Sequence, residues 1–293
     1  MYCEDCLRYT VINSLVRTAD LNDHQQLSNL IFFENRLHRH LDWRSPLEWL
    51  GAPFYWALEQ GRQISAALAC PPEVEGIAWL RLFVYSGHWS PDHAWSLLWA
   101  AAQEAIGQAG GATVAAIAMQ SWFQKVLAAS GFENRQRIIM LEWHQTGQAS
   151  FEANGVRIRR MNPVDLVQVM ETDHASFQPL WHNSLETLQR ALSQALYATV
   201  AETPDGIVGY QLTTGHGQRA HLARLAVHPS MQGRGVGGAL LKDLFGSLSG
   251  AGTQRLSVNT QNDNEASLSL YTKMGFVRTG EDYPVYSFVV PPR

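Results

Sequence analysis

The chain of 293 residues contains little cysteine, and its few cysteines exclude several kinds of protein. Three cysteines cannot form the disulfide framework of a small secreted domain. Cys3 and Cys6 form a lone C-x-x-C motif, but a zinc site needs a second pair of ligands at matching spacing, which Cys70 alone does not supply. We therefore expect no metal, and we interpret the pair as incidental.

The sequence also lacks an excess of basic residues and any long hydrophobic run. Its net charge is −4 and its pI is near 6.2, with basic residues scattered along the chain, which argues against a nucleic-acid partner. No apolar run approaches the roughly 18 residues of a membrane span. The first residues are acidic and lack the basic start and apolar block of a signal peptide. These absences predict a cytoplasmic protein with no membrane partner.

What the chain does have is enough apolar residues, 46%, for one large core or two ordinary ones. Apolar periodicity in its second half predicts the order β-α-α-β-β-β-α-β-α-β. The expected strands are 155–161, 196–203, 206–214, 219–228, 254–260 and 276–290, and the expected helices are 162–177, 184–194, 236–248 and 264–274.

The first half repeats this order. Its expected strands are 9–16, 76–84 and 112–118, with a hairpin over 54–70 that turns at Gln60–Gly61, and its expected helices are 19–33, 91–106 and 121–132. Gly131-Phe132 matches Gly275-Phe276 at an offset of 144 residues, and Asp20-Leu21 matches Asp165-Leu166 at an offset of 145. We therefore predict two tandem α/β folds with mixed sheets, in domains 1–148 and 149–293 that meet at the polar stretch 144–150.

A glycine-rich stretch, "LAVHPSMQGRGVGGALL" (225–241), contains both G-x-G-x-x-G and Q-x-x-G-x-G. A dinucleotide-binding site requires a strand that runs directly into the first glycine and an acid about 20 residues later. Here a loop intervenes and Asn259 stands in the acid's place. In the other interpretation, bare glycines let backbone N–H groups at a helix start bind a pyrophosphate. The first half has "WSPDH" (89–93) at the matching place, so we expect it to be degenerate.

Together with "NDNEASLSLYTKMGF" (262–276), this stretch resembles the acetyl-CoA core of the GNAT superfamily of N-acetyltransferases, over roughly residues 155–290. The resemblance implies a tandem GNAT protein with a degenerate first half, a layout similar to mycothiol synthase. It also implies acetyl-CoA as co-substrate. The positions that the resemblance assigns to its binding are Leu225, Ala226, Val227, Gln232, Gly233, Arg234, Gly235, Val236, Gly237, Gly238 and Asn264.

The resemblance further implies that an amine attacks the acetyl thioester directly. A backbone N–H at a bulge stabilises the oxyanion, and Val227 is our candidate because strict alternation breaks down over 225–227. Tyr271 is the expected proton donor to the leaving thiolate; the alternative is a core tyrosine. The usual glutamate is replaced by His221 on one strand and by Asn259 on the next. Serotonin N-acetyltransferase also has histidine at the first position, so His221 is a candidate base or a histidine that only packs.

The acceptor site is expected between the loops 177–184 and 280–287. Phe177, Trp181 and Tyr283 would form an apolar wall, and Glu281 and Asp282 would attract a cation. The acceptor is then an apolar primary amine or a peptide N-terminus. A mycothiol-synthase-like enzyme and a non-catalytic acyl-CoA sensor remain alternatives, and the oligomeric state is open.

Overall fold

A computed structural model describes residues 14–34, 36–144, 155–250 and 252–293. Its first half contains β1 (Ser14–Thr18), η1 (Leu21–Asp23), α1 (His24–Phe33), β2 (Leu37–Arg39), η2 (Pro46–Trp49), β3 (Tyr55–Gln60), β4 (Gln63–Ala69), β5 (Pro72–Val74), β6 (Ile77–Trp79), β7 (Leu82–Tyr85), α2 (Pro91–Gln108), β8 (Ala112–Ile117), α3 (Ser121–Ala129) and β9 (Glu133–His144).

The second half contains β10 (Arg157–Arg160), η3 (Pro163–Asp165), α4 (Leu166–Ser176), η4 (Pro179–Trp181), α5 (Leu185–Gln194), β11 (Tyr197–Thr203), β12 (Gly206–His216), β13 (Arg219–Val227), η5 (Pro229–Met231), α6 (Val236–Gly250), β14 (Arg255–Gln261), α7 (Glu265–Lys273) and β15 (Val277–Val290). Cys3, Cys6 and the expected domain boundary near residue 148 lie outside the described residues.

The predicted order of helices and strands is present in both halves, with three differences in the first. The strand expected over 76–84 is two strands, β6 and β7, which belong to different sheets because the chain bends at Leu80–Arg81. The hairpin turns at Gly61–Arg62 rather than Gln60–Gly61, and both turn residues have positive φ. Strands β2, β5 and β9 were not predicted.

The two halves repeat the same ion-pair cluster, which supports their description as tandem copies. In each half, an arginine on the first strand pairs with a carboxylate at the start of the first helix. It also pairs with a second carboxylate, which lies on the strand next to the first in the sheet. The clusters are Arg17 with Asp23 and Glu59, and Arg159 with Asp165 and Glu202. Asp23, and not Asp20, therefore corresponds to Asp165, so the sequence match at an offset of 145 was three residues out of register.

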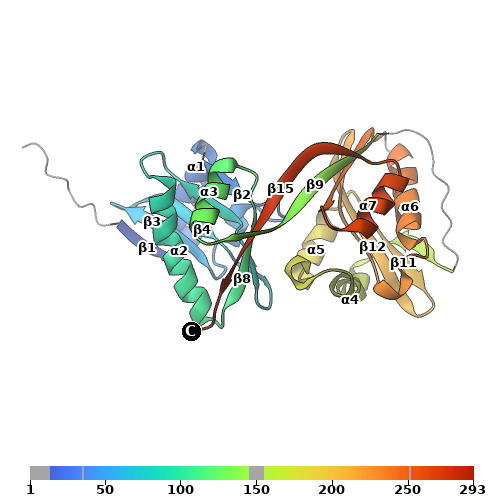
Figure 1. The fold of residues 1–293 in the computed structure, drawn as a ribbon, viewed down its shortest axis with the longest axis horizontal. Coiled ribbons are helices and arrows are strands. Elements are labelled where there is room, and N and C mark those ends of the chain that lie inside the picture. The colour runs from blue at the N-terminus through green and yellow to red at the C-terminus, as the bar shows by residue number, and fades with distance from the viewer. Residues whose placement is uncertain (1–13, 35, 145–154, 251) are drawn as a thin grey trace, which may run out of the picture.

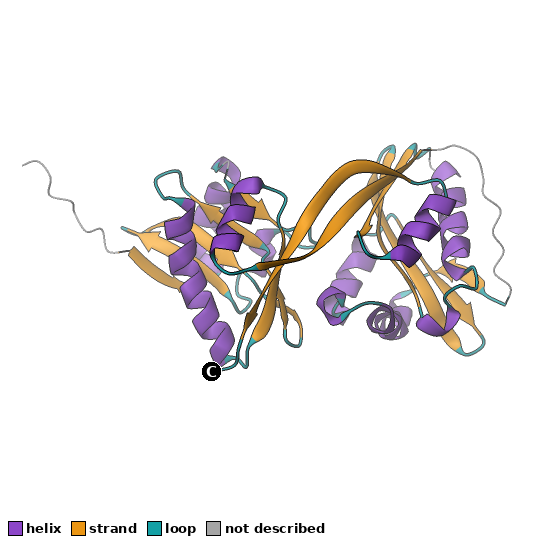
Figure 2. Cartoon of the chain, viewed as in Figure 1, coloured by secondary structure: helices purple, strands orange, loops and turns teal. Residues whose placement is uncertain are grey.

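One continuous sheet joins the halves, because each contributes a strand to the other's side. Its order is β10-β11-β12-β13-β14-β9-β15-β8-β6-β5. Strand β9 of the first half pairs with β14 of the second, and β15 lies between β9 and β8. Figure 1 shows β9 and β15 crossing from one half to the other as a twisted pair, and Figure 2 shows the helices packed around the sheets on either side. None of the described helices is long and apolar enough to cross a membrane.

In the second half, two parallel strands separate and leave an opening. Strands β13 and β14 are in register from Arg219, opposite Arg255, to Leu222, opposite Val258, and no pairing continues beyond that point. The register of β13 against β12 shifts at Ala223. The bulge therefore lies at Ala223 and not at 225–227, where the sequence led us to expect it. We call the space beyond Leu222 the β13–β14 opening.

In the first half, the corresponding edge is covered by the protein itself. Strand β2 pairs antiparallel with β7 on the side that β4 leaves free. Its central residue, His38, is fully buried, stacks on Phe123 at 4.2 Å and contacts the Leu80 carbonyl at 3.0 Å through Nε2. Burial lowers the pKa of His38 to about 4, so the imidazole packs there in its neutral form.

The halves also meet through a buried carboxylate. Glu73, the central residue of β5, pairs with Arg81 at 2.7 Å through Oε2. Its Oε1 accepts hydrogen bonds from the backbone N–H and hydroxyl of Ser184 and from the hydroxyl of Thr187, at the N-terminus of α5. A carboxylate is favoured at that end of a helix. Glu73 thus fixes the loop before α5 of one half to the sheet of the other.

We expect Glu73→Gln to destabilise the protein, because the change removes the closer of the two carboxylates that pair with the buried Arg81 guanidinium. Breaking a buried ion pair costs about 3 kcal/mol or more. Urea unfolding followed by tryptophan fluorescence measures the loss. Glu75→Gln, two residues away at an exposed position, is the matched control and should change the free energy of unfolding by less than about 0.5 kcal/mol. Equal effects of the two changes would contradict this role for Glu73.

Candidate functional site

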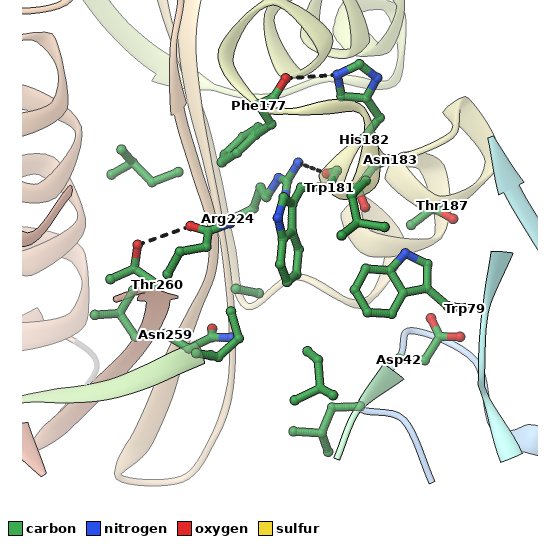
Figure 3. Close-up of a pocket in the computed structure, with 18 of the residues that line it drawn as sticks. Asp42, Trp79, Phe177, Trp181, His182, Asn183, Thr187, Arg224, Asn259 and Thr260 are labelled. Carbon is green, nitrogen blue, oxygen red and sulfur yellow. Dashed lines mark hydrogen bonds between the residues drawn. The ribbon is translucent and has the colours of Figure 1, made fainter. Parts of the chain in front are cut away.

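A cavity of about 200 Å³ lies between the halves, at the end of the β13–β14 opening. We call it the interface cavity. Its lining residues are His40, Leu41, Asp42, Trp43, Glu73, Trp79, Arg81, Ile117 and Ile138 of the first half, and Phe177, Leu180, Trp181, His182, Asn183, Thr187, Leu222, Ala223, Arg224, Leu225, Val258, Asn259, Thr260, Gln261, Asn264, Ser267 and Tyr271 of the second. Figure 3 shows residues of both halves facing one another across it.

Tyr271 is brought into the cavity lining by α7. That helix begins at Asn264, whose side chain accepts a hydrogen bond from the Ser267 N–H at 3.0 Å, as expected for a capping residue. The Tyr271 side chain is only 4% exposed. Burial raises its pKa well above that of a free phenol, and the positive charge of Arg224 opposes this shift. The phenol is therefore protonated at neutral pH, and its burial makes it a weaker acid than a free phenol.

His221 lies outside the cavity lining. Its Nδ1 is 2.9 Å from the hydroxyl of Ser257 on β14. Burial lowers the pKa of His221, and a hydrogen bond with Asn259 opposes that shift in part. The imidazole is thus neutral at pH 7, and its hydrogen-bond partner Asn259 lines the cavity.

Backbone groups of β13 face the β13–β14 opening. The N–H of His228 donates to the Val208 carbonyl on β12. Because the bonds of an antiparallel ladder alternate, the N–H groups of Val227 and Leu225 point the other way, toward the opening. Of these two residues, Leu225 also lines the interface cavity. The Val227 carbonyl already accepts from Gln232 at 3.0 Å.

The glycines that follow β13 have identifiable structural roles. Gly233 and Gly235 have positive φ, which favours glycine. A Cβ on Gly237 would lie 2.9 Å from the Leu270 side chain, so this glycine lets α6 approach α7 closely. Gly238 and Val236 are buried at the start of α6, and Ala226 is buried in β13. The first N–H groups of α6 have no acceptor within their own helix and remain available to a ligand.

The remaining side chains of this loop are more exposed. Arg234 and Gln232 lie at the surface beside the start of α6. His228 caps η5, because its Nδ1 accepts a hydrogen bond from the Ser230 N–H.

Two of the three predicted acceptor residues line the cavity. Phe177 and Trp181 do so, and Trp181 contacts Trp79 of the first half with ring centroids 5.2 Å apart. Tyr283 is not among the lining residues; it pairs with Ile138 in the β9–β15 ladder, and its hydroxyl donates to Glu281 at 3.4 Å. Asp282 is bound by Arg137 and also lies outside the cavity.

Arg224, which the sequence analysis did not single out, is held inside the cavity wall by several contacts. Its Nε donates to Asp173 at 2.8 Å, its Nη2 donates to the Trp181 carbonyl, and its guanidinium lies over the ring of Phe177 at 3.6 Å. Asp173 is fully buried and also accepts from the Tyr210 hydroxyl. The spacing of these residues along the chain gave no signal, because only the packing of α4 on β12 and β13 brings them together.

The first half contributes charged and polar groups that sequence motifs could not reveal. Arg81 pairs with Glu73 and lies 3.3 Å from Asp42. His40 lines the cavity, and its pKa is lowered well below the usual value by burial, with the charge of Arg81 adding to this. Within the described ranges no group of three or more His, Cys, Asp or Glu side chains could hold a metal ion.

Comparisons with known proteins agree with this arrangement. Residues 166–276 match a family model described as the acetyltransferase (GNAT) family. A tandem GNAT protein from the clavulanic acid biosynthesis pathway, solved without AcCoA, superposes with a TM-score of 0.63 at 14% identity, covering 96% of this chain and 99% of that one. A GCN5-related N-acetyltransferase from Sphaerobacter thermophilus gives 0.62 at 15% identity, covering 95% and 96%. A probable N-acyltransferase from Enterococcus faecalis gives 0.71 at 10% identity, covering 95% and 72%.

Proposed function

We propose that the protein moves an acetyl group from acetyl-CoA to a primary amine, because residues 166–276 match the acetyltransferase (GNAT) family model. The amine nitrogen bonds to the thioester carbonyl carbon, the C–S bond breaks, and the sulfur leaves as a thiolate that must gain a proton. The amine must lose one. We assign the acetyl-CoA site to residues 149–293 and an acceptor-shaping role to residues 1–148.

The observation that carries this assignment is the contrast between the two strand edges. In the second half, Leu225 and Val227 present backbone N–H groups to the β13–β14 opening, where a pantetheine arm can pair as an added strand. In the first half, β2 pairs along the corresponding edge of β7, and the central residue of β2, His38, is buried. This edge of β7 is therefore not free to pair with a second acetyl-CoA.

The glycine loop suits the pyrophosphate for two reasons. Gly233, Gly235 and Gly237 carry no side chain that would hinder an approach to the backbone, and the start of α6 offers unpaired N–H groups at the positive end of its dipole. Gln232 and Arg234 lie exposed beside it and can supply side-chain donors. Asn264, at the start of α7, lines the cavity where the arm would end.

Within the cavity, Tyr271 would protonate the leaving thiolate, since it is the buried phenol in the lining. The N–H of Leu225, together with that of Val227, would stabilise the oxyanion, because both point into the opening. We assign the removal of the amine proton to His221, through water beside Asn259, because its imidazole is neutral at pH 7. His40 is a second candidate base, since it is also neutral and lines the cavity itself.

The stoichiometry of acetyl-CoA binding tests the assignment to one half. Calorimetric titration should give one site per chain, and Gly235→Glu should abolish it, because a carboxylate would stand at the loop that receives the pyrophosphate. Gly246→Glu, at an exposed position of α6 with nothing within 4 Å of a new Cβ, is the matched control and should bind as the wild type does. Two sites, or one site that survives Gly235→Glu, would contradict the proposal.

Replacement of Tyr271 by Phe tests the proton donor. We expect kcat to fall by about 100-fold or more, with little change in the Kd for acetyl-CoA, since the ring still packs. Tyr197→Phe, which removes a hydroxyl bonded to Asp243 outside the cavity, serves as the control. Thiol release and calorimetry measure the two quantities. Wild-type turnover in Tyr271→Phe would remove this role, and binding without any turnover in the wild type would favour an acyl-CoA sensor.

The pH profile of kcat distinguishes the two candidate bases. The base must be unprotonated, and because burial lowers the pKa of His221 the activity should decline with falling pH only below about 6.5, the ordinary value for histidine. We expect His221→Gln to lower kcat and to remove this acid limb, while His40→Gln retains it. The reverse result would assign the proton transfer to His40.

A further inference from the structure

The interface cavity is lined by two guanidinium groups whose donors are only partly used by the described residues. Arg81 and Arg224 both line it, one from each half, and both side chains are largely buried, with 7% and 15% of their surface exposed. The Nη2 of each is bonded within the protein, to Glu73 and to the Trp181 carbonyl. Across the described part of the chain, the Nη1 of neither arginine has a hydrogen-bond partner.

The carboxylates of the lining have no comparable free capacity. Both oxygens of Glu73 are occupied, by Arg81 and by the groups at the start of α5. Asp42 accepts from the Trp43 N–H through Oδ1 and from the Trp49 indole through Oδ2, and the latter oxygen also lies beside Arg81. The unused groups of the two arginines are therefore N–H donors, which suit the oxygens of a carboxylate.

The charge balance of the cavity restricts which anion can bind. Arg81 and Arg224 face Glu73, Asp42 and the buried Asp173, so the carboxylates exceed the guanidinium groups by one. A simple anion would meet this surplus negative charge unfavourably. A molecule that carries an ammonium group as well as a carboxylate can use the free donors without adding net negative charge to this surplus.

Resting on the proposed function, we propose that the acceptor is a small amino acid, a zwitterion whose carboxylate binds the free Nη1 groups of Arg81 and Arg224 while its amine faces Tyr271. The cavity volume of about 200 Å³ is below the usual range for drug-sized ligands, about 300–1,000 Å³, and fits a compact acceptor. Trp79 and Trp181, whose ring centroids are 5.2 Å apart, line the same cavity and offer an apolar surface to the acceptor's side chain.

The experiment compares each of the twenty L-amino acids with its amide and with the amine that lacks the carboxylate. Thiol release from acetyl-CoA gives kcat/KM, and ligand-observed NMR on the acetyl-CoA-saturated Tyr271→Phe protein gives binding. We expect at least one amino acid to be acetylated, with kcat/KM about 10- to 100-fold above that of its amide and its amine, the ratio that loss of a charge-assisted hydrogen bond produces.

Arg81→Gln should reduce that ratio toward unity and leave the Kd for acetyl-CoA unchanged; Arg81→Lys should restore part of it. Because the ratio compares substrates within one variant, partial destabilisation does not imitate the effect. Arg190→Gln is the matched control, since it removes an ion pair with Glu48 between the halves that lies outside the cavity lining.

The proposal is overturned if amides, amines or peptide N-termini are acetylated as well as amino acids, if no amino acid binds or reacts, or if Arg81→Gln keeps the wild-type ratio. These outcomes are distinct from failure of the proposed function, which would appear as absent acetyl-CoA binding or absent transfer to every amine.

Discussion

Strand β15 is the element on which the relative position of the two halves depends. It lies between β9 and β8, so backbone hydrogen bonds run without interruption from the sheet of one half into the sheet of the other. A linker alone would allow the halves to move, whereas a shared sheet holds them in one register. Only with that constraint can residues such as Arg81 and Tyr271, from different halves, line one cavity.

The two halves share one fold but differ at one strand edge, which is open in the second half and covered in the first. In the second, β13 and β14 separate beyond Leu222 and leave a strand edge open to a ligand. In the first, a short strand pairs along that edge, and an aromatic core of Trp95, Phe83 and Phe123 fills the space beneath it. The chain that follows β2 then reaches the interface cavity through His40 and Asp42. In the first half this strand edge is therefore covered, and the chain after β2 forms part of the wall of the interface cavity.

Much of the fold could be predicted from the sequence because apolar periodicity and capping signals are local. The helices with Asn264 and Ser184 at their N-termini formed as expected, and the tandem repeat was visible in the Gly-Phe pairs. Strand β2 could not be found this way: three residues, "LHR", carry no period, and they form a strand only because β7 offers an edge. Strand β9 did carry a signal, the apolar run around Ile138 and Leu141, but its partner β14 lies in the other half and no local pattern identifies it.

The residues that line the cavity also differ in whether a local sequence pattern could identify them. Tyr271 and Asn264 could be identified because they lie within a motif whose spacing fixes their place on one helix. Arg224 stood in the same strand as His221, yet its importance comes from Asp173, about fifty residues earlier, and from Phe177 packed on its guanidinium. Arg81 and Glu73 belong to the half that lacks the glycine loop, where no motif directs attention. A degenerate copy is free to lose its ligand motif, but it keeps the strands that position side chains. In this chain, Arg81 and Glu73 could therefore be found only from the packing of the two halves and not from a motif.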